Sequence, residues 1–345
     1  MRRLKLLFLF ICRSAGLFDV ARYVTRKNLK ILCYHGFEIN DETNFRPKLF
    51  ISREKFKQRI KTLEDYGYQV LTLDEAITAL YDKSLPDNSA VITIDDGFFS
   101  VAKLAAPILS QHKLPATVYV TTYYVENNNP IYRLTIQYMF WKTKKEGLVS
   151  SKTPWGEVEN CDLSTSEARD RIAWKYINYG ETQCSENQRV EICDRLGKEL
   201  GVSYDEIVRS GILRLMTLDE LRHLENDNID IELHTHRHVF PSDSRDDALR
   251  EINDNRRVLK NVVRRELTHF CYPSGYWKQQ QWEWLEAMGV TSATTCLPGL
   301  NSRSTPRLAL RRFLDGENIH QLEFEANLSG FSDIIRSSMA RLRFT

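Results

Sequence analysis

The sequence lacks a hydrophobic run long enough to cross a membrane. The apolar run near its N-terminus covers only residues 6–12 and ends at Arg13, whereas a membrane-spanning helix needs about 20 apolar residues. Glycine and proline are also scarce, with 15 and 10 residues in a chain of 345, which excludes collagen and low-complexity disorder. With 42% apolar residues, the chain can form one large core or two modest ones.

Paired cysteine motifs are absent as well. The seven cysteines are an odd number without CxxC spacing, and a chain of this length does not need disulfide bonds to fold. We therefore expect a cytoplasmic protein, placed at the inner membrane surface if its N-terminus binds lipid. Export stays an alternative, because Arg2, Arg3 and Lys5 precede the apolar run in the order of a signal peptide.

Positive charge is concentrated at the N-terminus. Residues 1–30 contain eight Lys or Arg against Asp19 alone, a net charge of +7, whereas the rest of the chain carries 40 basic and 45 acidic residues. The acidic body argues against a nucleic acid partner. We expect residues 1–29 to form a basic amphipathic segment that lies on an anionic membrane or packs on the domain, with a plain helix as the alternative.

From residue 30 onward, short β-rich runs alternate with helical patterns, which is typical of βα units around a parallel sheet or barrel. Capping boxes at Thr72 and Thr217 mark two helix starts. Between residues 126 and 212 a polar stretch with helical periodicity predicts an inserted helical subdomain, and residues 331–345 are expected to form a C-terminal helix or tail. The expected strands are residues 30–35, 90–95, 116–120, 229–233, 269–273 and 292–296.

Two adjacent carboxylates, Asp95 and Asp96, end the second of these strands and are followed by Gly97. In α/β folds the carboxyl ends of buried strands face the ligand site. Because neighbouring negative charges repel each other, a divalent cation bound by one aspartate would leave the other free as a base. The alternative is an ordinary helix N-cap.

Three histidines, His234, His236 and His238, follow the strand at residues 229–233. Imidazole together with carboxylate suits Zn, Fe, Ni or Co. In an extended strand all three side chains share one face, whereas on a helical turn only the first and third do, so the spacing does not choose the pair. A surface histidine cluster is the alternative.

Two further segments are weaker indicators. The strand at residues 269–273 breaks at Pro273, Ser274 and Gly275, a turn that can present a backbone N–H to an oxyanion but is more often only a turn. His35 ends the first strand, where a lone histidine is more often a satisfied core residue.

Together these elements resemble the polysaccharide deacetylases of the NodB-homology class, carbohydrate esterase family 4. TIDDG at residues 93–97 is similar to the family's TFDDG, HTHRH at 234–238 to H-S/T-x-x-H, and FCYPSG at 270–275 to F-R/A-Y/P-P-Y-G. CYH at 33–35 resembles the Tyr-His of the branch that includes poly-N-acetylglucosamine deacetylases. The resemblance covers roughly residues 30–125 and 213–330.

The resemblance implies an α/β fold, a deformed (β/α) barrel of the NodB type in residues 30–125 and 213–330, with 126–212 as a helical insertion. It also implies one divalent metal bound by Asp96, His234 and His238, with His236 outside this ligand set. Zn is the first expectation, with Co, Ni or Fe as alternatives.

For the reaction, the resemblance implies Asp95 as general base, while the metal polarises a water molecule and the acyl carbonyl. The backbone N–H near Ser274 is our candidate for holding the oxyanion. His35 is the candidate general acid, because a first-strand histidine is the proposed acid of the Tyr-His branch. Tyr272 and Trp277 are the expected substrate contacts.

The sequence departs from the family pattern in three places. The later Asp-x-x-Trp and Leu-x-His motifs are not evident after Ser292. Cys271 stands where many members have an arginine that orients the base, and Ser274 where a tyrosine is usual.

The function expected from these features is metal-dependent removal of acetyl or similar acyl groups from amino sugars of a polysaccharide or a lipid-linked glycan. The lipid-linked form, with peripheral membrane contact through residues 1–28, follows from the basic N-terminus. The alternatives are a non-catalytic carbohydrate-binding barrel and a metal amidohydrolase that uses His234 and His236 as an H-x-H pair.

Overall fold

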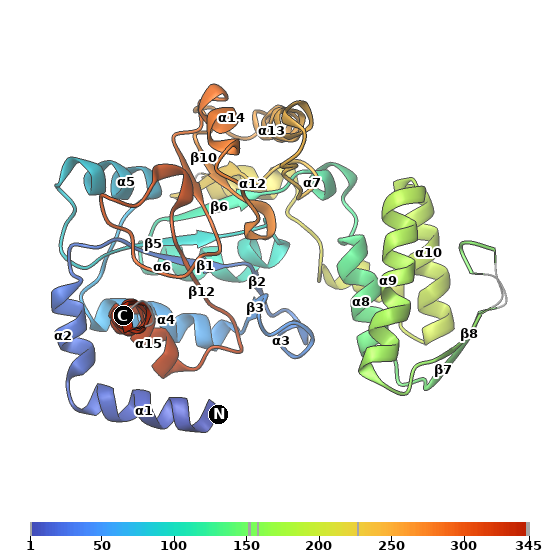
Figure 1. The fold of residues 1–345 in the computed structure, drawn as a ribbon. Coiled ribbons are helices and arrows are strands. Elements are labelled where there is room, and N and C mark those ends of the chain that lie inside the picture. The colour runs from blue at the N-terminus through green and yellow to red at the C-terminus, as the bar shows by residue number, and fades with distance from the viewer. Residues whose placement is uncertain (1, 151–152, 157–158, 226–227, 343–345) are drawn as a thin grey trace.

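A computed structural model describes residues 2–150, 153–156, 159–225 and 228–342 of the chain (Figure 1). Its centre is a parallel sheet in the order β11-β10-β9-β6-β5-β1-β12, with β4 paired to β5. The strands are β1 (Lys30–Tyr34), β4 (Gln69–Val70), β5 (Ser89–Ile94), β6 (Ala116–Val120), β9 (Ile229–Leu233), β10 (His269–Cys271), β11 (Ser292–Thr294) and β12 (Phe313–Leu314).

The sheet curls until its two ends meet. Thr294 of β11 forms a parallel bridge with Leu310, which lies just before β12. Because β12 also pairs with β1 at the opposite end, the strands enclose a deformed barrel. This confirms the predicted α/β barrel, and all six predicted strands are present. The two-residue strands β4 and β12 escaped prediction because so short a segment carries no measurable alternation.

Helices cover the outside of the barrel. They are α4 (Arg53–Asp65), α5 (Leu73–Asp82), α6 (Ala106–Gln111), α12 (Leu218–Glu225), α13 (Arg245–Leu259), α14 (Gln281–Ala287) and α15 (Gln321–Leu328). The predicted capping boxes start two of them: the side chain of Thr72 accepts a hydrogen bond from the amide of Glu75, and Thr217 accepts one from the amide of Glu220. With both faces covered, strands such as β5 are buried throughout.

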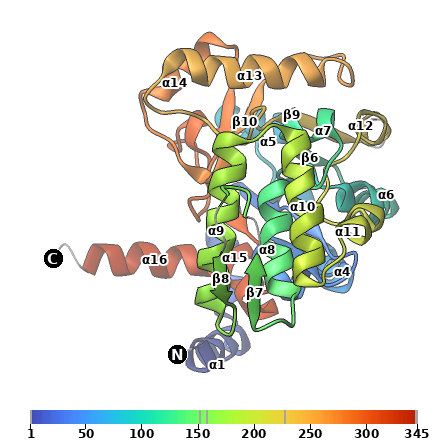
Figure 2. The ribbon, with the colours of Figure 1, turned by 90° about the vertical axis from the view of Figure 1, so that its right-hand side faces the viewer.

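The described residues between 132 and 210 stand beside the barrel and form helices α8 (Tyr132–Lys142), α9 (Ser166–Gln183), α10 (Glu186–Leu200) and α11 (Tyr204–Ser210) (Figures 1 and 2). The Tyr132 hydroxyl donates to the carbonyl of Tyr176 and joins α8 to α9. Gly180 lets the Tyr132 ring approach, because a β-carbon there would lie 2.3 Å from its hydroxyl. An antiparallel hairpin, β7 (Gly147–Ser150) and β8 (Glu159–Asp162), was not predicted in this segment.

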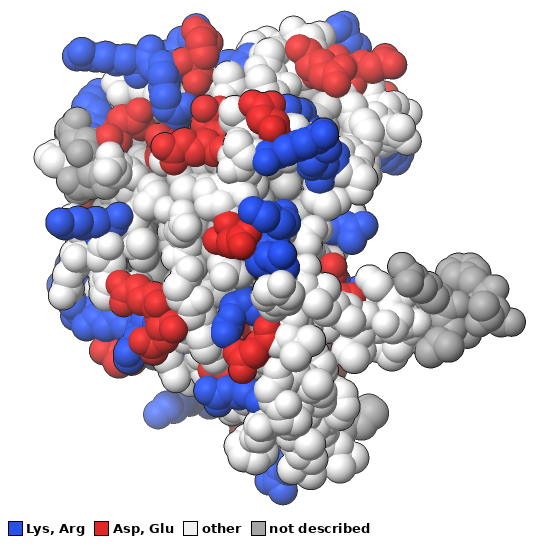
Figure 3. All heavy atoms as spheres, turned by 90° about the vertical axis from the view of Figure 1, so that its left-hand side faces the viewer, with Lys and Arg blue, Asp and Glu red and all other residues white. Residues whose placement is uncertain are grey.

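The N-terminal segment forms two helices, α1 (Arg2–Ser14) and α2 (Leu17–Val24). They pack against α15 and the C-terminal helix α16 (Phe331–Leu342) around a small separate core that includes Leu9, Phe18 and Phe331. Figure 2 shows α16 projecting from the body, and Figure 3 shows the face of the molecule on the α2 side. Among the described residues, no helix is long and apolar enough to span a membrane.

A buried ion pair fixes the segment that follows β12. The guanidinium of Arg59 on α4 donates to the carboxylate of Asp315 at 2.8 Å and to the carbonyl of Ile319 at 2.8 Å, and the Arg59 side chain is fully buried. The Asp315 amide donates to the carbonyl of Cys33. This pair therefore secures a strand that has only two residues of its own.

Replacing Arg59 with methionine should lower the free energy of unfolding by about 3 kcal/mol, because it leaves the Asp315 carboxylate buried without its charge partner. Urea denaturation followed by circular dichroism measures the change. The exposed Lys57 on the same helix is the control, and Lys57→Met should change stability by less than about 0.5 kcal/mol. Equal effects of the two substitutions would contradict the anchoring role of Arg59.

Candidate metal centre and catalytic site

The site begins at the turn that follows β5. Asp96 and Gly97 both have left-handed backbone conformations, with φ of 71° and 85°. Glycine is required at the second position because a β-carbon would approach Val120 to 3.1 Å while the backbone is already unfavourable for other residues. This turn sends the side chains of Asp95 and Asp96 in different directions.

Asp96 faces two histidines from the segment after β9. Its Oδ1 lies 3.3 Å from Nε2 of His234 and 3.3 Å from Nε2 of His238. Left-handed conformations at Thr235 and His238, with φ of 62° and 58°, bring the second histidine back beside the first, and their ring centroids are 4.9 Å apart. The Nδ1 of His234 lies 2.8 Å from the carbonyl of Cys271, which leaves its Nε2 directed at Asp96.

These three residues fit a divalent cation. Their ligand atoms all lie within 4.8 Å of one another, and within the described part of the chain the buried Oδ1 of Asp96 has no partner with hydrogen-bond geometry. Burial alone would raise the pKa of Asp96, but His234 and His238 outweigh it and hold that pKa well below its ordinary value. An ionised carboxylate with two imidazoles is a donor set for Zn and for Co, Ni or Fe.

His236 points away from this cluster. Its Nδ1 lies 2.9 Å from the hydroxyl of Thr122, and its Nε2 is 3.9 Å from Glu126. Its carbonyl accepts hydrogen bonds from the amides of Thr122 and Tyr123. The residue thus joins the loop after β9 to the start of α7 (Tyr123–Asn127).

Asp95 turns inward to a fully buried arginine. Nη1 and Nη2 of Arg312 donate to Oδ1 and Oδ2 of Asp95, each at 2.7 Å. Arg312 also donates to the Thr93 hydroxyl and the Thr295 carbonyl. Burial alone would raise the pKa of Asp95, but the charge and hydrogen bonds of Arg312 outweigh it and hold that pKa well below its ordinary value. The carboxylate is therefore ionised and fixed in orientation.

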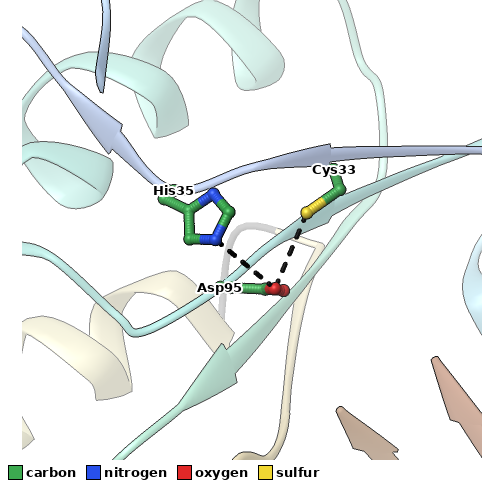
Figure 4. A group of neighbouring side chains, drawn as sticks. All are labelled: Cys33, His35 and Asp95. Carbon is green, nitrogen blue, oxygen red and sulfur yellow. Dashed lines mark hydrogen bonds and ion pairs between the residues drawn. The ribbon is translucent and has the colours of Figure 1, made fainter. Parts of the chain in front are cut away.

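Two thiols complete the surroundings of Asp95. The Sγ atoms of Cys33 and Cys271 lie 3.6 Å and 3.4 Å from its Oδ2 and donate to it, and Figure 4 shows Cys33 reaching Asp95 from the β1 side. Burial raises the pKa of both thiols well above the ordinary value. They are neutral hydrogen-bond donors here and not nucleophiles.

His35 approaches Asp95 from the β1 side, as Cys33 does (Figure 4). Its Nε2 is 3.8 Å from Oδ2 of Asp95, and its side chain is 16% exposed. Burial lowers the pKa of His35, against the attraction of the two aspartates. The imidazole is thus close to the candidate base and reachable from solvent.

The other expected residues are placed as follows. Ser274 is exposed and has a left-handed φ of 56° in the turn Pro273–Gly275 after β10. Trp277 is half-buried and stacks on Tyr272 and Trp282. Tyr272 is fully buried, with its hydroxyl bonded to the Leu308 carbonyl. This corrects the expectation that Tyr272 contacts substrate, because its ring is part of the core.

Arg312 is the residue that sequence reasoning missed. It lies between η3 (Arg307–Ala309) and β12, in a segment with no recognised motif. The only signal was negative, since Cys271 occupies the position of the family's arginine. The Arg312 guanidinium comes from the residue just before β12, pairs with Asp95 and also donates to Sγ of Cys271 at 3.2 Å.

Comparisons with known proteins agree with this architecture. A family model described as polysaccharide deacetylase matches residues 82–164 and 200–293, which is just over half of the chain. The chain belongs to the polysaccharide deacetylase family.

The curated relatives align over short segments. YxkH of Bacillus subtilis is 32% identical over 93 residues, covering 27% of this chain and 31% of that protein. A poly-β-1,6-N-acetyl-D-glucosamine N-deacetylase of Staphylococcus aureus is 32% identical over 79 residues, covering 23% and 27%. The matched segments thus span less than a third of these relatives.

Solved structures align over nearly the whole chain. Streptococcus pyogenes deacetylase PplD, in complex with acetate, has a TM-score of 0.59 at 17% identity and covers 87% of this chain and 98% of its own. IcaB from Ammonifex degensii has a TM-score of 0.52 at 17% identity, with 88% and 97% covered. At these identities the likeness establishes the fold.

The geometry makes a prediction for metal binding. His238→Ala should weaken Zn binding by more than about 100-fold. Loss of a residue that only supports a metal ligand costs up to about 100-fold in metal affinity, and loss of a ligand should cost more. His236→Ala, a matched change in the same loop, should leave binding unchanged. Competition titration with a chromophoric chelator measures both affinities. Loss of binding in His236→Ala with retention in His238→Ala would show that the other histidine pair holds the metal.

Proposed function

We propose that this protein is a metal-dependent hydrolase that removes acetyl groups from amino sugars of a polysaccharide. The observation that carries the proposal is that two adjacent carboxylates have different partners. Asp96 lies with His234 and His238, whereas Asp95 stays outside that cluster and is kept ionised by Arg312. Family membership and the deacetylase names of its relatives support the reaction class.

In the proposed reaction, Asp96, His234 and His238 hold the cation, which when bound supplies Lewis acidity to a water molecule and the acyl carbonyl. Asp95 accepts the proton of the attacking water, for which its fixed, ionised carboxylate is suited. The water oxygen bonds to the carbonyl carbon, and the C–N bond then breaks. His35, after taking up a proton from solvent, gives it to the departing amine, and the products are acetate and a free amino sugar.

The oxyanion that forms on the acyl oxygen also needs a donor from the chain. We assign this role to the backbone N–H near Ser274, because the turn after β10 lies next to Cys271, whose carbonyl orients His234. Trp277 remains the proposed contact for a sugar ring.

We also propose which metal is bound, which form the glycan has and where the enzyme is located. Zn is the proposed cation, with Co, Ni or Fe as alternatives. A lipid-linked glycan is the proposed alternative to a free polysaccharide, and residues 1–28 are the proposed membrane contact of an enzyme in the cytoplasm. The support is the net charge of +7 in residues 1–30.

Neither alternative function gains support from the site. An H-x-H amidohydrolase needs His236 beside His234, but His236 is held by Thr122. A non-catalytic binding barrel was suggested by the cysteine at position 271 and by the absence of the later Asp-x-x-Trp and Leu-x-His motifs. Arg312 answers the first of these grounds, because its guanidinium pairs with Asp95.

Asp95→Asn should lower the turnover of acetate release by at least about 100-fold, because the amide cannot accept the proton of water. Its Zn affinity should stay within about threefold of native, since Asp95 is not a ligand. Acetate release from acetylated chito-oligosaccharides measures the activity, and the exposed Asp82→Asn is the control. Native turnover in Asp95→Asn would sink the proposed mechanism.

Arg312→Lys should lower kcat by about tenfold to 100-fold and leave KM nearly unchanged, because lysine keeps the charge but loses the two parallel hydrogen bonds that orient Asp95. Zn affinity should be native in this variant. The neighbouring Arg311 is exposed, so Arg311→Lys is the matched control. A parallel loss of Zn binding, or a change in KM alone, would assign Arg312 a different role.

A further inference from the structure

Each of the two N-terminal helices packs on the protein through one side, where Leu9 and Phe18 are buried, and turns a second apolar side outward. We propose that the outward faces of α1 and α2 dock on the surface of an anionic lipid bilayer, with their apolar side chains inserted among the acyl chains. The inference rests on the proposed membrane contact of residues 1–28 and names the side chains that would make it. This surface lies outside the catalytic site, so the inference does not depend on the proposed reaction.

One side of α1 packs on the body, where Leu9 and Cys12 are buried between cations that pair with α15. Arg2 and Lys5 form ion pairs with Glu323 of α15 at 3.6 Å and 2.6 Å, and Arg13 pairs with Glu325 at 2.8 Å. A surface helix of a water-soluble domain ordinarily buries its apolar stripe and exposes its charges. Helix α1 buries Leu9 and Cys12 beside its ion pairs to α15 and in addition leaves a second apolar side outward.

The second apolar side of α1 is exposed. Leu4, Leu7 and Ile11 follow one another at the i, i+3, i+7 spacing of a single helical face, with Phe8 and Phe10 on its two flanks. These five side chains are between 49% and 71% exposed. Single exposed apolar residues are common on protein surfaces, but a contiguous group of this size marks a binding surface.

Helix α2 repeats the pattern. Leu17, Val20 and Val24 have the same spacing, Tyr23 flanks them, and the four are between 43% and 67% exposed. We call these nine residues of α1 and α2 the lipid face. A tyrosine beside an aliphatic stripe is typical of the membrane–water boundary, where the ring is partly apolar and the hydroxyl is hydrated.

The lipid face continues toward the C-terminal helix. Val24 of α2 and Ile334 of α16 line the same surface hollow of about 760 Å³, and Met339 of α16 is also exposed. In Figure 3 the lower right part of the surface is broad and free of charged side chains, with Lys and Arg at its border, and it extends toward the projecting α16. The exposed apolar surface therefore belongs to three helices.

Charge selects a bilayer over a second copy of the chain. Residues 1–30 carry +7, and a net charge of +4 remains when the three carboxylates elsewhere in the chain that pair with them, Asp87, Glu323 and Glu325, are included. Two copies joined through this face would therefore bring like charges together, whereas an anionic membrane attracts them. The cations stay accessible despite their ion pairs, because the side chains of Arg2 and Lys5 are each 61% exposed. Apolar insertion and headgroup attraction then act together, as in interfacial helices.

Vesicle flotation of the full chain tests this inference. The native protein should float with vesicles of phosphatidylcholine and phosphatidylglycerol, and less with phosphatidylcholine alone. Ile11→Ser and Val20→Ser should each lower the partition coefficient by about tenfold, because each removes a side chain that inserts. The matched control is Val208→Ser on α11, an exposed position far from these helices in the sequence, and it should partition like the native protein.

Several results would overturn the inference. They are equal partitioning of Ile11→Ser and the native protein, no binding of the native protein to either vesicle, or a lipid-free dimer in light scattering that Ile11→Ser dissociates. The last result would identify the face as a contact between copies. Acetate release from a soluble substrate should be native in Ile11→Ser, so a failure of lipid binding is distinguishable from a failure of the proposed deacetylase activity.

Discussion

The site depends on the separation of two carboxylates that are adjacent in the chain. Left to themselves, Asp95 and Asp96 would repel each other, and burial would favour protonation of at least one. The left-handed backbone at Asp96 directs the two side chains apart, so that each meets its own partners. Asp96 meets two histidines and Asp95 meets an arginine, and both remain ionised. One carboxylate can then serve as a ligand while the other serves as a base.

The closure of the barrel brings Asp95 its charge partner. The chain returns from the β11 edge through Leu310 to β12 and thereby inserts Arg312 beneath β5. The anchoring pair of Arg59 and Asp315 lies directly after that strand. A guanidinium from the residue just before β12 pairs with Asp95, while position 271, where many family members have an arginine, holds a thiol. Asp95 thus has a guanidinium partner that comes from another part of the chain.

The barrel strands and the residues of the candidate metal cluster could be picked out from the sequence because their signals are local. Six strands were long enough to show a buried run, and the motifs containing Asp95, Asp96 and the three histidines lie at strand ends. Arg312 was not predictable, since its role depends on a two-residue strand and on a contact with residues more than 200 positions away. The spacing of the histidines likewise did not show whether His236 or His238 joins His234, because this depends on the backbone turn between them.

The N-terminal helices illustrate the same limit. Their composition predicted an amphipathic segment, but it could not tell which side faces outward, because Glu323 and Glu325 lie at the other end of the chain. Pairing with these carboxylates, together with the burial of Leu9 and Cys12, sets the rotation of α1, and the exposed stripe is its consequence. Sequence patterns indicate which residues share a face, whereas contacts with distant residues decide where that face points.

The most direct test of the whole account is anomalous diffraction from crystals of the native protein grown with Zn. The account predicts one peak at the metal edge, about 2.0–2.2 Å from an oxygen of Asp96 and from a nitrogen of each of His234 and His238, with Asp95 bound to Arg312 and not to the metal. A peak ligated by Asp95, Cys33 or His236, or no peak between Asp96 and the two histidines, would contradict it.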